Sequence, residues 1–94
     1  MKYCKSTIYF ATNGASTDKA TDKAVSLLGG YTLGEHKGGW ESQGIIVEEN
    51  SYTLTIITPE SRSAETTELA MYIKSEYKQS EVWVTEEEIK NTIF

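Results

Sequence analysis

The fold is decided by the stretch GWESQGIIVEENSYTLTII, residues Gly39 to Ile57. Its centre, Ser42-Gln43-Gly44, is a turn signal between two runs of strand-forming residues, and this arrangement predicts a β-hairpin. The second run has the two-residue period of a strand with two different faces: Tyr52, Leu54 and Ile56 on one face and Thr53, Thr55 and Ile57 on the other. The stretch indicates a fold class but no chemistry, because it lacks the spacing of a metal cluster or a phosphate loop.

Three further segments have the apolar alternation or the residue types of strands. Tyr3 to Thr12 is the first, and Tyr31 to Trp40 leads into the hairpin. Several glycines dilute this second segment, so it is expected at a sheet edge or with a bulge. Glu81 to Thr85 is the last strand. After it, Glu86-Glu87-Glu88 is predicted to be a solvated bulge or loop, and Ile89 to Phe94 either continues the strand or forms a turn.

Two helices are predicted by apolar residues spaced three and four positions apart. Ser16 or Thr17 caps the first helix, and Gly29-Gly30 ends it. The second begins after Pro59 and runs to about Tyr77. The apolar stripes consist of Ala20, Ala24, Leu27 and Leu28 in the first helix and of Leu69, Ile73 and Tyr77 in the second.

The resulting order, β-α-β-β-α-β, predicts an α+β fold of the ferredoxin-like type, in which two helices cover one face of a four-stranded antiparallel sheet. At 94 residues, the whole chain 1–94 is expected to form one domain. The uncovered sheet face would carry Tyr9, Ile57 and Trp83, which is a large apolar load for a solvated surface. We therefore expect a homodimer that buries this face.

Charge and cysteine content restrict the partners and the compartment. Nine basic and fourteen acidic residues give a net charge of -5, which disfavours direct binding to nucleic acid and suits a protein partner with a basic surface. Cys4 is the single cysteine, so no disulfide forms within the chain. No apolar stretch has the length of a signal peptide core or a membrane span. These features predict a cytoplasmic protein without membrane contact.

Several short motifs are shared with known proteins: Gly39-Trp40, Gly44, Glu49-Asn50-Ser51, Leu54, Ile56, Tyr77-Lys78-Gln79, Val82 and Val84. On these residues, together with the aromatic strand Ile8-Tyr9-Phe10, most of the sequence resembles an uncharacterised family of short ferredoxin-like proteins from bacteria, phages and other mobile elements. The resemblance implies the fold and a mobile-element setting. It implies no reaction, because the family has no assigned activity.

His36 is the only histidine, and beside Glu35 it is the one candidate for proton transfer. No nucleophile or second histidine lies near it in the sequence, so an exposed residue on an edge strand is the favoured interpretation. The glutamate runs would not hold a metal ion, since neighbouring residues of a strand point to opposite faces. We therefore predict no catalytic residue, no metal and no cofactor, and the protein is expected not to be an enzyme.

Two functions remain. The first is a non-enzymatic, protein-binding accessory module of a phage or mobile element, with inhibition of a host defence nuclease as one role. Its partner-binding residues would be Tyr9, Ile57, Trp83, Glu86, Glu87 and Glu88. The alternative is a domain that binds or sequesters a small ligand and works as a sheet-to-sheet homodimer. Its ligand-binding residues would be His36, Trp40, Glu49 and Ser51.

Overall fold

The computed structural model of the chain describes residues 3–90. Its elements follow one another as β1 (Tyr3–Phe10), α1 (Asp18–Leu28), β2 (Thr32–Ser42), β3 (Ile45–Thr58), α2 (Ser63–Glu76) and β4 (Trp83–Ile89). The strands form one sheet in the order β2-β3-β1-β4, and all neighbouring strands are antiparallel. The predicted α+β, ferredoxin-like architecture is confirmed.

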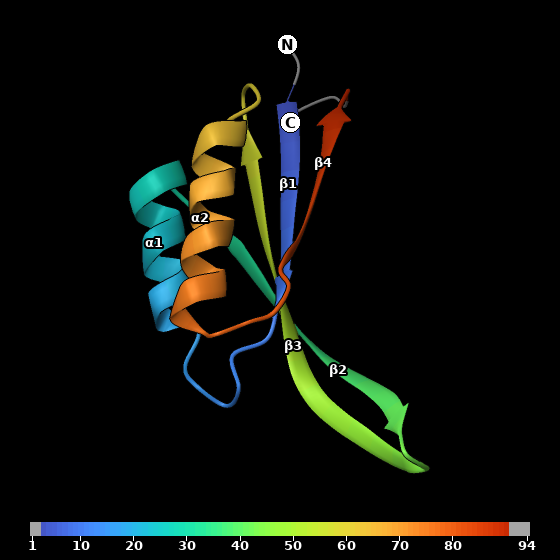
Figure 1. The fold of residues 1–94 in the computed structure, drawn as a ribbon. Coiled ribbons are helices and arrows are strands. Elements are labelled where there is room, and N and C mark those ends of the chain that lie inside the picture. Colours follow the sequence, from blue (N-terminus) through green and yellow to red (C-terminus); the bar gives the residue numbers. More distant parts are fainter. Residues whose placement is uncertain (1–2, 91–94) are drawn as a thin grey trace.

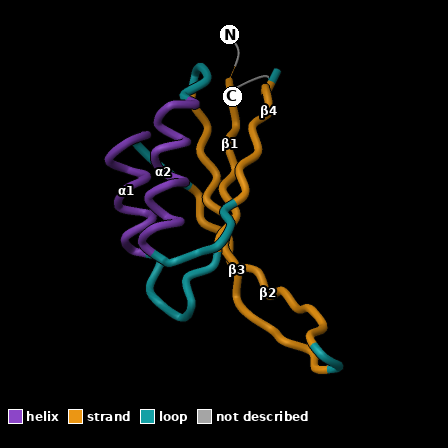
Figure 2. Tube along the Cα trace, in the orientation of Figure 1, coloured by secondary structure: helices purple, strands orange, loops and turns teal. Residues whose placement is uncertain are grey.

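The molecule has two layers, with both helices on one face of the sheet (Figure 1). The tube view shows the same separation, with α1 and α2 side by side and the other sheet face free of helices (Figure 2). We call this uncovered surface the open face. No helix in residues 3–90 is long and apolar enough to cross a membrane.

The central hairpin is much longer than the sheet that supports it. Gln43 and Gly44 both have positive φ angles, of 52° and 80°, which is the backbone of a two-residue type I′ turn. The pairing of β2 with β3 continues without a bulge from Thr32 to Ser42, so the glycines of β2 mark an edge strand only. Residues 45–51 of β3, which precede Tyr52, pair with β2 and not with β1. The two-stranded part, residues 36–51, projects from the body and is called the arm here (Figure 1).

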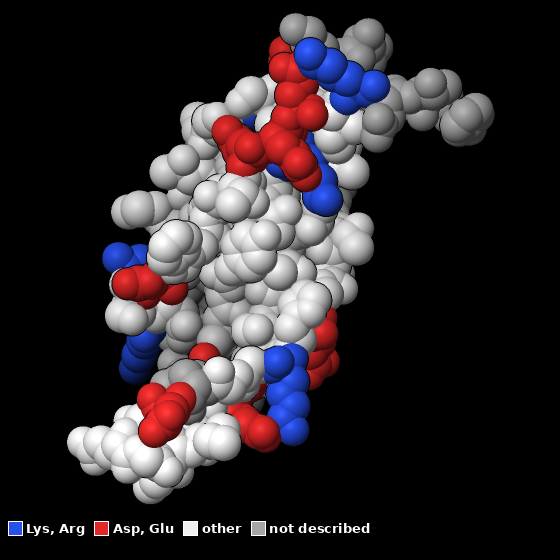
Figure 3. Space-filling view, turned by 90° about the vertical axis from the view of Figure 1, so that its right-hand side faces the viewer, with Lys and Arg blue, Asp and Glu red and all other residues white. Residues whose placement is uncertain are grey.

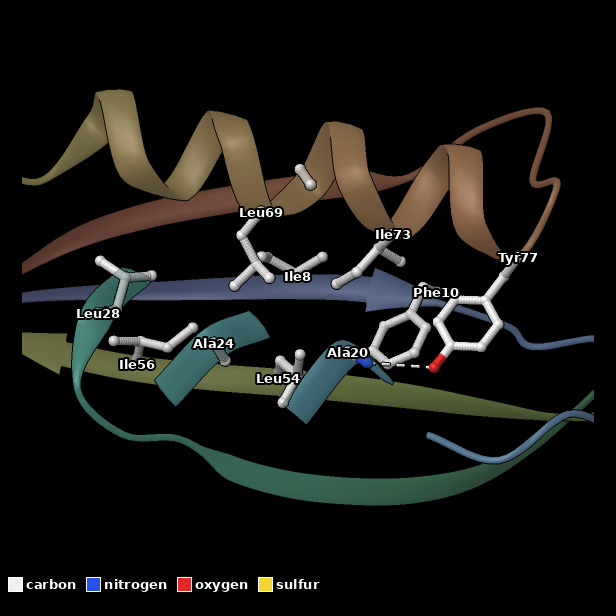
Figure 4. Packing of buried hydrophobic residues seen from close by; sticks show 11 residues of the cluster. Ile8, Phe10, Ala20, Ala24, Leu28, Leu54, Ile56, Leu69, Ile73 and Tyr77 are labelled. Carbon is white, nitrogen blue, oxygen red and sulfur yellow. Dashed lines mark hydrogen bonds between the residues drawn. The ribbon is translucent and has the colours of Figure 1, made fainter. Parts of the chain in front are cut away.

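The core lies between the helices and the sheet (Figure 4). Ile8, Leu54, Leu69 and Ile73 are the largest fully buried side chains. They come from two strands and one helix, and the alternation of β1 and β3 and the stripe of α2 predicted these positions. The remaining members of the cluster are Phe10, Ala20, Ala24, Leu28, Ile56, Ala70 and Tyr77. The predicted Ala20, Ala24 and Leu28 of α1 thus lie in the core, and Leu27 packs against it partly buried.

Tyr77 joins the end of α2 to the beginning of α1. Its buried hydroxyl donates a hydrogen bond to the carbonyl oxygen of Ser16 at 2.8 Å and accepts one from the amide of Ala20 at 3.2 Å. We expect Tyr77→Phe to lower the free energy of unfolding by about 1–3 kcal/mol, because a buried amide loses its acceptor. Urea denaturation followed by circular dichroism measures this difference.

The same hydroxyl makes stability depend on pH. Burial raises the pKa of Tyr77 above its usual value, because the phenolate would lose water. The stabilisation is therefore complete below about pH 10, the pKa of an unfolded tyrosine, and it is lost as the pH rises through the higher folded pKa. In Tyr77→Phe this loss should be absent. An unchanged alkaline transition in the variant would contradict the assignment.

The end of β4 differs from the sequence-based expectation at the glutamate run. Glu86-Glu87-Glu88 belongs to β4, where it pairs with residues 4–6 of β1, so the prediction of a loop or bulge was wrong. A run of glutamates is a poor strand former, but pairing with β1 outweighs this preference. Ile89 continues the strand opposite Tyr3. The predicted end of the chain, residues 91–94, lies outside the described residues.

Candidate functional site

A polar and aromatic band crosses the open face in one row of the sheet. The row contains Gly34 of β2, Thr53 of β3, Tyr9 of β1 and Trp83 of β4, which are cross-strand neighbours in the register. Trp83 is 68% exposed, and its indole donates a hydrogen bond to the Glu81 carboxylate at 2.9 Å. The predicted exposure of Tyr9 and Trp83 on the uncovered face is confirmed.

His36 belongs to the same band, although it lies one position further along the face. Its Nε2 is 3.2 Å from the Oγ1 of Thr53. A Cβ at Gly34 would lie 2.8 Å from this Oγ1 and 3.1 Å from the histidine Nε2. Gly34 therefore leaves the space that the imidazole occupies. The sequence placed His36 on an exposed edge without a partner: the structure confirms the edge and adds Thr53 as the partner.

The other predicted ligand residues lie further along the same face of the arm. Ser51 is directly opposite His36, and Glu49 is opposite Gly38, where no side chain covers it. Trp40 pairs with Val47 on this face, but its side chain is outside the described part of the structure. The register thus brings His36, Ser51 and Glu49 to one surface, which continues the band toward the tip of the arm.

The next row of the open face consists of four threonines, one from each strand: Thr32, Thr55, Thr7 and Thr85. The row after it contains Ile57, Lys5 and Glu87. The Lys5 ammonium is 3.6 Å from the Glu87 carboxylate. The row thus offers hydroxyl groups that both donate and accept hydrogen bonds, between an aromatic row and an aliphatic side chain.

The three glutamates of β4 do not form one surface. Glu87 is on the open face, whereas Glu86 and Glu88 are on the helix side, next to the beginning of α2. Glu86 accepts hydrogen bonds from Ser6 at 3.3 Å and from Ser63 at 3.2 Å, so it also satisfies the buried Ser6 hydroxyl. Of the three glutamates predicted to bind a partner, Glu87 therefore shares the open face with Tyr9 and Trp83, whereas Glu86 and Glu88 do not. Residues 3–90 contain no group of side chains that would hold a metal ion.

Thr53 and Gly34 were missed as site residues. Thr53 had been assigned to the face opposite Tyr52 and Leu54, but a single strand does not reveal its neighbours. Only the register of β2 with β3 brings Thr53 against His36 and makes the absence of a side chain at Gly34 necessary. A glycine two positions before a histidine in an edge strand is too common a pattern to indicate this arrangement alone.

At the sequence level the chain matches no protein family model and no curated protein. Solved structures are nevertheless similar. A phage SAM lyase in complex with S-methyl-5'-thioadenosine has a TM-score of 0.70 at 17% identity, over 92% of this chain and 81% of that protein. The GlnK–ATP complex of B. subtilis has a TM-score of 0.68, also at 17% identity, over 98% of this chain and 85% of that one.

The CutA protein of Archaeoglobus fulgidus, described as a periplasmic divalent cation tolerance protein, has a TM-score of 0.64 at 13% identity. The match covers 99% of this chain and 88% of CutA. At these identities the likeness concerns the backbone. Two of the similar structures are phage proteins, and the phage setting expected from the sequence stays a prediction. The chain has the ferredoxin-like fold of the phage SAM lyase, GlnK and CutA.

Proposed function

We propose that the protein binds a small ligand with an adenosine moiety on its open face, where a second copy of the chain encloses it. The observation that carries the proposal is the band of His36, Thr53, Tyr9 and Trp83. Exposed aromatic rings stack on a purine base, and the hydroxyl and imidazole offer donors and acceptors to the polar edge of the base or to a ribose. Two structures of this fold were solved with methylthioadenosine and with ATP, which supports the same ligand class.

A second copy is part of the proposal because the band lies on a sheet surface and not in a deep cavity. Small-molecule sites bury most of the ligand surface, and one sheet face covers only one side of it. Tyr9, Ile57 and Trp83 remain exposed in the single chain. A partner sheet would supply the second wall of the site and bury these apolar groups in the same step.

The charge of the protein distinguishes between the possible adenosine ligands. The net charge of -5 repels a triphosphate, and Lys5 on the open face is already paired with Glu87. Glu49, on the same face, suits a neutral or cationic ligand. We therefore favour methylthioadenosine or SAM over ATP.

The protein-binding accessory module, which the sequence placed first, stays a prediction. The similar structures are those of a lyase, of a cation tolerance protein and of an ATP complex. They support ligand binding more than binding of a protein partner. We also propose binding without turnover, since the His36 imidazole is hydrogen-bonded to the Thr53 hydroxyl and, among residues 3–90, to no carboxylate that would orient it as a base. Incubation with SAM followed by chromatography should show no conversion.

Calorimetric titration tests the ligand. We expect methylthioadenosine and SAM to bind, and ATP to bind at least about tenfold more weakly because of charge repulsion. Trp83→Ala should weaken binding by about fivefold to a hundredfold, the equivalent of one lost base-stacking contact. Val25→Ala, an exposed apolar position on α1, is the matched control and should change nothing. Failure of all three ligands to bind, or tightest binding of ATP, would contradict the proposal.

A further inference from the structure

The tip of the arm carries apolar side chains that the chain itself does not cover. Ile45 and Ile46 are 67% and 74% exposed, which makes them two of the most exposed large apolar side chains in the described residues. Ile46 lies on the helix side of the arm, directly opposite Glu41. No ion pair within residues 3–90 involves Glu41. An isoleucine beside an unpaired carboxylate is thus presented at the end of the molecule.

The arm also lacks support along its length. A two-stranded hairpin is marginally stable in water when nothing packs against it. The arm has one described ion pair across its strands, Lys37 with Glu48 at 3.0 Å, and none of its described side chains belongs to the hydrophobic core. Its contacts within the chain therefore leave most of its surface exposed, which favours an external partner.

A groove of about 460 Å³ lies elsewhere on the same molecule, between α2 and the edge strand β4. Met71, Val82, Trp83 and Val84 form its apolar part, and Lys74 lines it as well. Met71 is 65% exposed, and Lys74 has no ion-pair partner among the described residues. Figure 3 looks onto this edge of the molecule, where the surface across the middle of the body is largely uncharged.

The arm does not reach the groove of its own chain. Trp83 is in the same row as Thr53, and Ile46 precedes Thr53 by seven positions in the uninterrupted strand β3. At about 3.3 Å per residue the tip therefore lies roughly 23 Å beyond the groove along the strand. Only another copy of the chain can bring this tip to this groove.

We propose that the tip of the arm of one copy docks into the groove between α2 and β4 of a second copy. Ile46 contacts Met71 and Val84, and Glu41 pairs with Lys74 at the rim. The apolar tip is complementary to the apolar groove. The Glu41 carboxylate beside the tip is likewise complementary in charge to the Lys74 ammonium beside the groove. The contact joins two different surfaces, so it is made reciprocally in a dimer or repeated around a closed ring.

Disulfide trapping between differently labelled copies tests the contact. In a Cys4→Ser background, Ile46→Cys protein is mixed with Met71→Cys protein and oxidised with copper phenanthroline. The linked dimer should form at least about tenfold faster than with Val25→Cys as the partner, because docking raises the effective concentration of the two thiols. Val25 is a comparably exposed apolar residue on α1 and serves as the control. Equal rates for the two mixtures would overturn the proposal.

A charge exchange provides the second measurement. Glu41→Lys and Lys74→Glu should each weaken self-association by about fivefold, as expected for loss of a rim ion pair, and the double variant should recover it. Light scattering gives the association constant. A chain that stays monomeric at about 100 µM, or a double variant no better than the single ones, would also overturn the contact. Neither readout requires a ligand, so a failed ligand titration leaves this inference intact.

Discussion

Leu54→Ala is expected to lower the free energy of unfolding by about 2–5 kcal/mol, a large share of the stability of a domain of this size. Leu54 has no exposed surface, and it lies in the middle of β3 between Ile8 of β1 and Leu33 of β2. Truncation leaves a cavity that the helices above it do not fill by relaxing. Urea denaturation monitored by circular dichroism measures the loss.

Ile57→Ala is the matched control, because it removes an aliphatic side chain from the same strand. Ile57 is on the open face and is 57% exposed in the single chain. At a protein concentration at which the chain is monomeric, Ile57→Ala should lower the free energy of unfolding by less than about 1 kcal/mol. The reason is that folding removes little apolar surface from water at this position. Equal losses for the two variants would show that Leu54 does not occupy the centre of the core.

Thr7→Glu is expected to abolish association through the open face while leaving the fold intact. Thr7 is on a central strand, in the middle of the threonine row of the open face. An unpaired carboxylate buried between two sheets costs about 3–5 kcal/mol, which raises the dissociation constant by more than about a hundredfold. Light scattering should give a lower mass for the variant than for the unaltered protein, because association through the open face is lost and only the arm contact remains.

The same charge placed on the helical side provides the control. Ser26→Glu changes an exposed position of α1 and should leave the mass in solution unchanged. The circular dichroism spectrum of Thr7→Glu should match that of the unaltered protein. A Thr7→Glu protein that still associates fully would exclude the open face as the interface, and with it the enclosed ligand site.

The order and type of all six elements followed from local patterns. The alternation around Leu54 and Ile8 and the stripe of Leu69, Ile73 and Tyr77 identified the buried faces, because burial selects apolar residues at the period of each element. The end of β4 could not be predicted. Three glutamates have no strand preference of their own, and their strand conformation comes from pairing with β1 at the other end of the sequence.

The candidate site was predicted only in parts. Exposed aromatic residues on an uncovered face, such as Trp83, follow from alternation once the fold is known. The contact of His36 with Thr53 depends on how two strands are aligned, and the separation of Glu86 from Glu87 depends on which strand is their neighbour. Both are relations between residues far apart in the chain, which local patterns do not contain.

The unbroken register of the arm has a consequence for how fast the protein folds. Every pair in residues 36–51 joins positions that are close in the chain, so the arm adds only local contacts and closes progressively from the Gln43-Gly44 turn. Folding speed depends mainly on contacts between distant positions, which here belong to the pairs of β1 with β3 and β4. A change in the length or sequence of the arm should therefore leave the folding rate of the body that carries it unchanged.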